Sequence, residues 1–342
     1  MAQADRIKFI SLLQIIGVSA VVLYHSLHEY PGNWDATLYN RLFVSIRMPL
    51  FVFISGYLFN FSRLKSGRLK PYKDFFTGKI QRLIVPFLFL SIITFVPRVM
   101  LSGMADDAIE LSFKSFFGSL LFSDQYVIIF FWFLPAIFIL LNLVYGSLAL
   151  FKREEVAYAI LFILGLIFFF LSPFDNLTFL AFGKVLSYFL FFVSGVIYVR
   201  YHEKLDKILG NWFALILSML LWLGSIYIPS DAAIFSLTAR LFGLSMVVSF
   251  SLLFCNKCGW LMHLEGYTYI IYLLSWYTCT LSQQVLAHFT DFDWWVYTLL
   301  AFFSSIYIPR GIAWLLYSKA PSMKSARALL WLLGHNPKRS LK

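Results

Sequence analysis

The feature that most constrains the fold is a series of long apolar segments that recurs from one end of the chain to the other. The first runs from Ile7 to Leu27 and would extend ~30 Å as a helix at ~1.5 Å per residue, enough to cross the hydrocarbon core of a bilayer. Only 13% of the residues are charged, about half the fraction of a typical soluble domain. In lipid a helix satisfies its own backbone hydrogen bonds. The pattern therefore predicts an all-α, polytopic membrane protein without a sizeable soluble domain.

The apolar segments predict about ten transmembrane helices in a single membrane domain, followed by a cytoplasmic tail at 319–342. The sequence shows no repeat of 20–50 residues and no low-complexity linker. The expected spans are about 7–28, 41–61, 79–101, 126–151, 155–172, 179–200, 211–229, 233–255, 266–287 and 294–318.

The distribution of charge between the loops predicts the orientation. Most of the 28 Lys and Arg residues lie near the two ends of the chain and after the second, fourth, sixth and eighth spans. The other loops carry mainly Asp and Glu. By the positive-inside rule both termini are expected in the cytoplasm of a multi-pass protein of the cell inner membrane. The net charge of +11 is then a topology signal, and the sequence does not indicate a nucleic-acid partner.

The three cysteines do not indicate a metal or redox centre. Cys255 and Cys258 have CxxC spacing, but no second pair accompanies them. A structural zinc site takes four ligands, so inert thiols at a helix end are the favoured interpretation, and we expect no metal cofactor.

A few ionisable side chains remain inside the predicted spans, where they are costly and tend to have a function. Most fall in the outer third of the membrane, and no carboxylate accompanies them. They favour a cavity that binds an anionic ligand or a transition state that develops negative charge, although Arg and Lys can also snorkel to the headgroups. Snorkelling is favoured for Arg98 and Lys184, function for Arg47 and Arg240, and Arg310 could meet a cytoplasmic anionic cofactor. The full set is His25, Arg47, Arg98, Lys184, Arg240 and Arg310.

His25, near the outer end of the first span, is the candidate general base. Glu29 follows at i+4 on the same helix face and could orient the imidazole, as acids do in catalytic triads. His28, at i+3, is a competing partner. A lone histidine near an interface is more often structural, so from the residues alone both interpretations stay open.

Five segments, in order along nearly the whole chain, resemble the motifs of the integral-membrane acyltransferase 3 family. The closest resemblance is to its fucose- and hexose-acetylating proteins. The segments are RIKFISLLQIIGVSAVVLYHS at 6–26, RMPLFVFISGYLF at 47–59, KIQRLIVPF at 79–87, WFLPAIFILLNL at 132–143 and YTYIIYLLSW at 267–276.

The resemblance implies a ten-helix membrane protein that O-acylates sugars of cell-surface polysaccharides. It implies that His25 is the catalytic base and that Arg47 occupies a position that is commonly polar. Arg82 matches the basic residue that opens the third helix, where it could meet phosphates of an acyl-coenzyme A or simply mark the inner membrane boundary. The chain departs from the family pattern at Gln14 and Ser11, where many members carry arginine and aspartate, and at Ser275, where many carry histidine.

The resulting hypothesis is an O-acetyltransferase embedded in membrane lipid. It moves an acetyl group from cytoplasmic acetyl-CoA to a hydroxyl of a cell-surface or lipid-linked sugar or polysaccharide. Two alternatives remain: a transporter or flippase of an anionic lipid-linked glycan, and a family member with impaired catalysis. The absence of repeated halves argues against the transporter. The hypothesis assigns catalysis to His25, Arg47 and Glu29, donor binding to Arg82, Arg310 and Gln14, and acceptor binding to Arg240, Lys184, Trp132 and Ser275.

Overall fold

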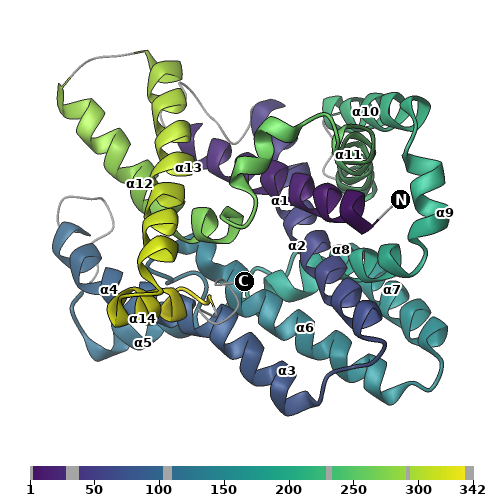
Figure 1. Cartoon of the computed structure of the whole chain (residues 1–342), viewed down its shortest axis with the longest axis horizontal. Coiled ribbons are helices and arrows are strands. Elements are labelled where there is room, and N and C mark those ends of the chain that lie inside the picture. Colours follow the sequence, from purple (N-terminus) through teal and green to yellow (C-terminus); the bar gives the residue numbers. More distant parts are fainter. Residues whose placement is uncertain (1–2, 28–37, 103–109, 229–232, 290–292, 336–342) are drawn as a thin grey trace. The chain divides into compact units, whose positions relative to one another are not determined.

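The chain folds as an all-α membrane protein (Figure 1). The computed structural model describes residues 3–27, 38–102, 110–228, 233–289 and 293–335. Within these ranges there is no strand, and the one isolated bridge joins Phe122 to Phe179. Eight described helices are long and apolar enough to cross a membrane, or up to nine if a bent pair counts as one span. The predicted fold class, an all-α multi-pass membrane protein, is confirmed.

Each of the ten predicted spans coincides with a helix or a helix pair, but the count of ten stays a prediction. The predicted span 211–229 corresponds to α10 (Trp212–Tyr227), which satisfies the length criterion only together with α9 (His202–Leu209), and the two meet at an angle of 78°. Among the described helices, α12 (Thr268–Phe289) is not one of the eight. The glutamines and hydroxyl-bearing residues of α12 explain its lower hydropathy.

The chain divides into two compact units. One comprises residues 1–57 and 195–315, and the other residues 58–194 and 316–342. We refer to them as unit 1 and unit 2. The divisions fall within α2 (Leu38–Ser66), α8 (Phe182–Arg200) and α13 (Trp294–Lys319).

In unit 1, α10 packs along α11, and α1 packs against α12 and α11 (Figure 1). Gly195 of α8 permits a close approach to α2, because a Cβ atom there would lie 2.1 Å from the carbonyl oxygen of Phe53. Besides the helices already named, unit 1 contains α1 (Gln3–Ser26), α11 (Ala233–Phe254) and the 3₁₀ helix η5 (Gly259–Leu264).

A buried ion pair ties α1 to α9 within unit 1. Arg6 is 6% exposed and donates to both carboxylate oxygens of Asp206 and to the hydroxyl of Tyr57, at 3.3 Å in the last case. Tyr198 donates to Asp206 Oδ1 at 2.7 Å. Each buried charge therefore has a partner, as burial requires. The sequence indicated only that Arg6 belongs to the basic N-terminal end.

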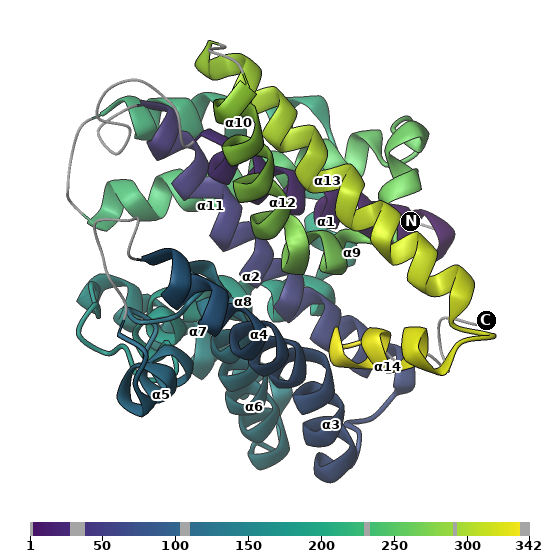
Figure 2. The ribbon, with the colours of Figure 1, turned by 90° about the vertical axis from the view of Figure 1, so that its left-hand side faces the viewer.

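In unit 2, a single π-helical turn, η3 (Ile80–Ile84), joins α3 (Tyr72–Lys79) to α4 (Val85–Ser102). The helix therefore starts at Tyr72, seven residues before the predicted span at 79–101. The turn η3 packs against α6, and α14 packs against α4 (Figure 2). The other elements are α5 (Phe113–Leu121), η4 (Ile129–Trp132), α6 (Phe133–Leu150), α7 (Glu154–Leu171) and α14 (Lys324–Leu332).

Candidate functional site

The candidate base and the candidate oxyanion donor meet at one aromatic ring in unit 1. The half-buried His25 lies at the end of α1, and its ring makes an edge contact with Tyr24 at 5.4 Å between centroids. The guanidinium carbon of Arg47, on α2, lies 3.4 Å from the centroid of the same Tyr24 ring. This cation–π contact holds the guanidinium against the ring. The structure thus brings His25 and Arg47 together around Tyr24.

Helix α12 fixes the end of α1 that carries His25. The thiol of Cys279 donates to the carbonyl oxygen of His25 at 3.6 Å, and the amide of Gln283 donates to the carbonyl oxygen of Ser26 at 3.2 Å. Both contacts act on carbonyls at a helix C-terminus, which have no partner within the helix. Sequence reasoning missed Cys279 and Gln283, although their i, i+4 spacing places them on one face of α12. Glu29, the predicted orienting acid, lies outside the described residues.

Two of the three positions that depart from the family pattern, Ser275 and Ser11, have hydrogen-bond partners in unit 1. Ser275 is buried, and its hydroxyl donates to the carbonyl oxygen of Tyr272 in its own helix at 3.3 Å. Ser11 donates to Glu265 Oε1 at 2.8 Å. Gln14, predicted to bind the donor, lies on α1 one turn after Ser11 and is half-buried. A carboxylate from the end of η5 therefore lies beside the position where many family members carry an aspartate.

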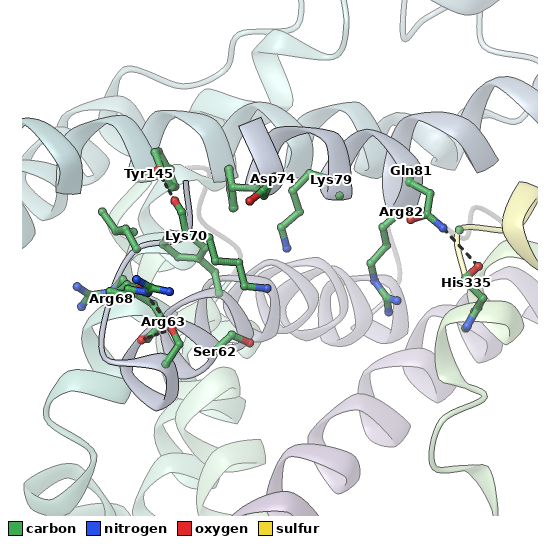
Figure 3. A pocket seen from close by; sticks show the side chains of 16 residues that line it. Ser62, Arg63, Arg68, Lys70, Asp74, Lys79, Gln81, Arg82, Tyr145 and His335 are labelled. Atoms are coloured by element: carbon green, nitrogen blue, oxygen red, sulfur yellow. Dashed lines mark hydrogen bonds between the residues drawn. The ribbon is translucent and has the colours of Figure 1, made fainter. Parts of the chain in front are cut away.

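Unit 2 contains a cavity of about 510 Å³ whose charged lining is mostly positive (Figure 3). We call it the cationic cavity. Five cationic side chains and one carboxylate, Asp74, belong to the lining. The lining residues are Phe59, Ser62, Arg63, Ser66, Arg68, Leu69, Lys70, Asp74, Phe75, Gly78, Lys79, Gln81, Arg82, Tyr145, Gly334 and His335.

The helical segment of α3 and η3 positions two of these cations. Lys79 ends α3 and Arg82 lies three residues later in the π-helical turn, so both extend in the same direction, toward the space that Lys70 also enters (Figure 3). The hydroxyl of Tyr145 donates to the carbonyl oxygen of Lys70 at 2.6 Å, which fixes the loop before α3. π-Helical turns are often found at functional sites.

Arg63 forms a bidentate ion pair in the wall of the cavity. Its guanidinium forms two hydrogen bonds to Glu154, at 2.6 and 2.9 Å, and its Nε donates to Asn60 at 2.8 Å. The bidentate geometry is the strong form of this pair. We therefore assign Arg63 to the wall of the cavity.

An aromatic wall accompanies the cations. Phe75 stacks on Tyr145 with 4.5 Å between centroids and an interplanar angle of 22°, and Phe59 meets Phe75 edge-on at 5.8 Å. The ammonium of Lys79 lies 5.6 Å from the Phe75 centroid. A cationic surface beside aromatic rings can bind a ligand that carries both phosphates and a flat ring system.

A second cavity, of about 440 Å³, lies in unit 1 and contains Arg240, one of the predicted acceptor-binding residues. We call it the arginine cavity. Arg41 also lines it and donates to the carbonyl oxygen of Ile226 at 3.0 Å. The sequence indicated only a loop cation at Arg41. The other lining residues are Asn40, Val44, Ser45, Ser225, Ile226, Ile228, Phe235, Ser236 and Ala239.

The remaining predicted site residues line neither cavity. Arg310, in unit 1, donates from Nε to a backbone carbonyl of η5 at 3.1 Å. Lys184 lies 3.8 Å from Asp175, and both side chains are well exposed, at 43% and 76%, which favours the snorkelling interpretation. Trp132 stacks on Tyr188 with 5.4 Å between centroids.

Among the residues that the structure describes, no group of three or more His, Cys, Asp and Glu side chains could hold a metal ion. Cys255 and Cys258 are free thiols. Burial raises the pKa of Cys255, which lowers the reactivity of that thiol.

Comparison with known proteins gives one match. A family model described as an acyltransferase domain matches residues 7–314. The matched range includes His25, Arg47 and most of the cationic cavity, but it ends before Gly334 and His335. No curated protein and no solved structure matches the chain.

Proposed function

We propose that this chain, which belongs to the acyltransferase 3 family, moves an acetyl group from acetyl-CoA to a hydroxyl group of a cell-surface or lipid-linked sugar. The observation that carries the proposal is the cationic cavity in a membrane acyltransferase. We place the enzyme in the cell inner membrane, where the donor is available in the cytoplasm and the glycan lies outside. The charge pattern of the loops supports this orientation.

The donor's phosphates are assigned to the cationic cavity. Coenzyme A carries a pyrophosphate and a 3′-phosphate, and anionic oxygens of this kind are bound by guanidinium and ammonium groups. Arg68, Lys70, Lys79 and Arg82 supply these groups. The aromatic residues Phe59, Phe75 and Tyr145 give the lining an apolar side beside these cations, and we assign the adenine to that side. The resemblance to the family motif at Arg82 points to the same ligand.

The chemical step is assigned to His25 and Arg47. The imidazole takes the proton of the sugar hydroxyl, the oxygen attacks the thioester carbonyl, and the carbon–sulfur bond breaks. The imidazolium returns the proton to the departing coenzyme A thiolate. The Arg47 guanidinium stabilises the oxyanion of the tetrahedral intermediate. In a variant of this scheme the imidazole itself is acetylated before the sugar attacks.

The arginine cavity is assigned to the acceptor. Arg41, Arg240 and Ser236 of its lining offer hydrogen-bond donors to sugar hydroxyls and to acidic substituents. The hydroxyls of Ser45 and Ser225 donate to carbonyl oxygens of their own helices. The positive-inside rule places the α2 residues of this lining toward the outer side, where a surface glycan is found.

Transfer of radiolabelled acetyl groups by the purified protein in liposomes tests the proposal. We expect wild-type protein to label an added glycan and His25→Ala to lose this activity while expression and insertion stay normal. Lys152→Ala, which removes an exposed side chain that lines neither cavity, serves as the control and should retain activity. Transfer by His25→Ala at the wild-type rate would contradict the role of the base. Glycan translocation without any acetyl transfer would favour the transporter. An acid quench that leaves label on the protein would favour the acetyl-histidine variant.

A further inference from the structure

The C-terminal segment contributes a wall of the cationic cavity, although it lies outside the family domain. The match to the family ends at residue 314, whereas Gly334 and His335 line the cavity. The segment is held in place by the way α14 ends. The N–H of His335 donates to the carbonyl of Leu330 at 2.8 Å, and that of Gly334 to Trp331 at 3.0 Å. With a φ of +77° at Gly334, this is a Schellman C-cap.

The same segment contacts the π-helical turn that carries Arg82. Gln81 donates from its side-chain amide to the carbonyl oxygen of His335 at 3.4 Å (Figure 3). A Cβ atom at Gly334 would lie 2.6 Å from the carbonyl oxygen of Arg82, so only glycine permits this approach. The chain end and η3 therefore form one wall, and its geometry depends on both segments.

The imidazole of His335 is suited to donate a hydrogen bond to an anion. Its Nδ1 lies 2.9 Å from the hydroxyl of Tyr317. Burial and the charge of Arg82 lower the pKa of His335 to about 4, so the ring is neutral at pH 7. The 2.9 Å contact fits either direction; where the Tyr317 hydroxyl donates to Nδ1, the proton of the neutral ring lies on Nε2 and this atom is a donor. A neutral donor next to Arg82 adds affinity for an anion without adding repulsion between cations.

We propose that residues 324–335 complete the donor-binding site and that the imidazole of His335 donates a hydrogen bond to a phosphate group bound by Arg82. The identity of that phosphate as part of coenzyme A rests on the proposed function. The consequence is that residues 7–314 alone lack a wall of the proposed donor site, and donor affinity depends on the C-terminal helix and its cap.

Equilibrium binding of coenzyme A to the full-length purified protein tests the proposal. A hydrogen bond to a charged group is worth enough to change affinity about tenfold or more, so His335→Ala should weaken binding by roughly that factor. His335→Gln retains an N–H donor and should stay within about threefold of wild type. Gly334→Ala should weaken binding because the added methyl group displaces the segment from η3. Arg327→Ala removes an exposed cation of α14 that does not line the cavity, and it should bind as wild type does.

Two further measurements separate the possible outcomes. In the transferase assay His335→Ala should raise the KM for acetyl-CoA and leave kcat unchanged, and inorganic pyrophosphate should compete less well with coenzyme A for this variant than for wild type. Should His335→Ala fail to fold, Tyr317→Phe deletes one hydroxyl that fixes the tautomer and should weaken binding severalfold. Wild-type protein that binds no coenzyme A would overturn the proposed function. If His335→Ala and Gly334→Ala bind coenzyme A as tightly as wild-type protein does, only the role of the C-terminal segment is overturned.

Discussion

Replacing Arg82 by alanine should weaken donor binding, and the size of the effect follows from its position. Two unit charges ~4 Å apart interact with ~1 kcal/mol in water and ~4 kcal/mol at an effective dielectric constant of ~20. Arg82 is an exposed residue of the cationic cavity's lining, so the lower part of this range applies. A loss of ~1–2 kcal/mol corresponds to a KM for acetyl-CoA that is ~5–30-fold higher. The kcat should not change, because Arg82 is not assigned to the chemical step.

The assay is transfer of labelled acetyl groups at two salt concentrations. The Debye length falls from ~10 Å at 0.1 M ionic strength to ~3 Å at 1 M, so the difference in KM between Arg82→Ala and wild type should shrink at high salt. Lys152→Ala is the matched control. Lys152 is also exposed and lies in a basic loop, but it is not part of the cavity lining, and its loss should leave KM unchanged.

Dephospho-coenzyme A, which lacks the 3′-phosphate, shows which phosphate Arg82 meets. If Arg82 binds the 3′-phosphate, removing both the Arg82 side chain and this phosphate should raise KM no more than removing one of them, as in a double-mutant cycle. If Arg82 binds the pyrophosphate, the two losses of binding free energy should add. An unchanged KM in Arg82→Ala at 0.1 M, or an equal rise in Lys152→Ala, would refute the reasoning, because only the net charge of this face would then matter.

Two helix contacts and the guanidinium beside the candidate base give further predictions. Arg63→Ala should lower Tm, with a loss of ~1–3 kcal/mol, because it leaves the Glu154 carboxylate without its bidentate partner; adding Glu154→Gln should restore part of the loss. Gly195→Ala should also lower Tm, with a loss of ~1–3 kcal/mol in stability, since its methyl group would overlap a backbone carbonyl of α2. Gly146→Ala, which has open space, should leave Tm unchanged; thermal unfolding in detergent measures both pairs. Arg47→Ala should lower kcat ~100–1000-fold with little change in KM, and steady-state kinetics would contradict the oxyanion role if KM rose instead.

The helices could be predicted from the sequence because lipid imposes both their length and their composition. The second predicted span, 41–61, lies inside α2. The third begins late, because Lys73, Asp74 and Thr77 make the first two turns of the helix polar, and an apolar pattern cannot show where a polar turn continues a span. The π-helical turn η3 was not predicted either, since one extra residue per turn leaves no trace in hydropathy.

Site residues could be predicted only where a family motif, or an ionisable side chain inside an apolar span, singled them out. His25 and Arg47 were found separately, as ionisable groups inside spans, and the structure adds Tyr24 as the ring that both of them contact. Asp206 and Glu154 were missed as ion-pair partners. They lie far along the chain from Arg6 and Arg63, and no sequence pattern connects them with those two arginines. Periodicity tells which face of a helix is buried, but it does not tell which residue of another element meets that face.

The same limit bears on the departures from the family pattern at Ser11 and Gln14. From the sequence alone, the absence of an aspartate and an arginine in the first helix suggests impaired catalysis. In space, Ser11 donates to Glu265, so a carboxylate is still present beside this turn of α1, supplied from η5. In this chain a serine at position 11 therefore lies beside a carboxylate and is hydrogen-bonded to it. Weakened catalysis does not follow from Ser11 by itself; the neutral Gln14 and Ser275, at positions where many members carry arginine and histidine, remain as the arguments for it.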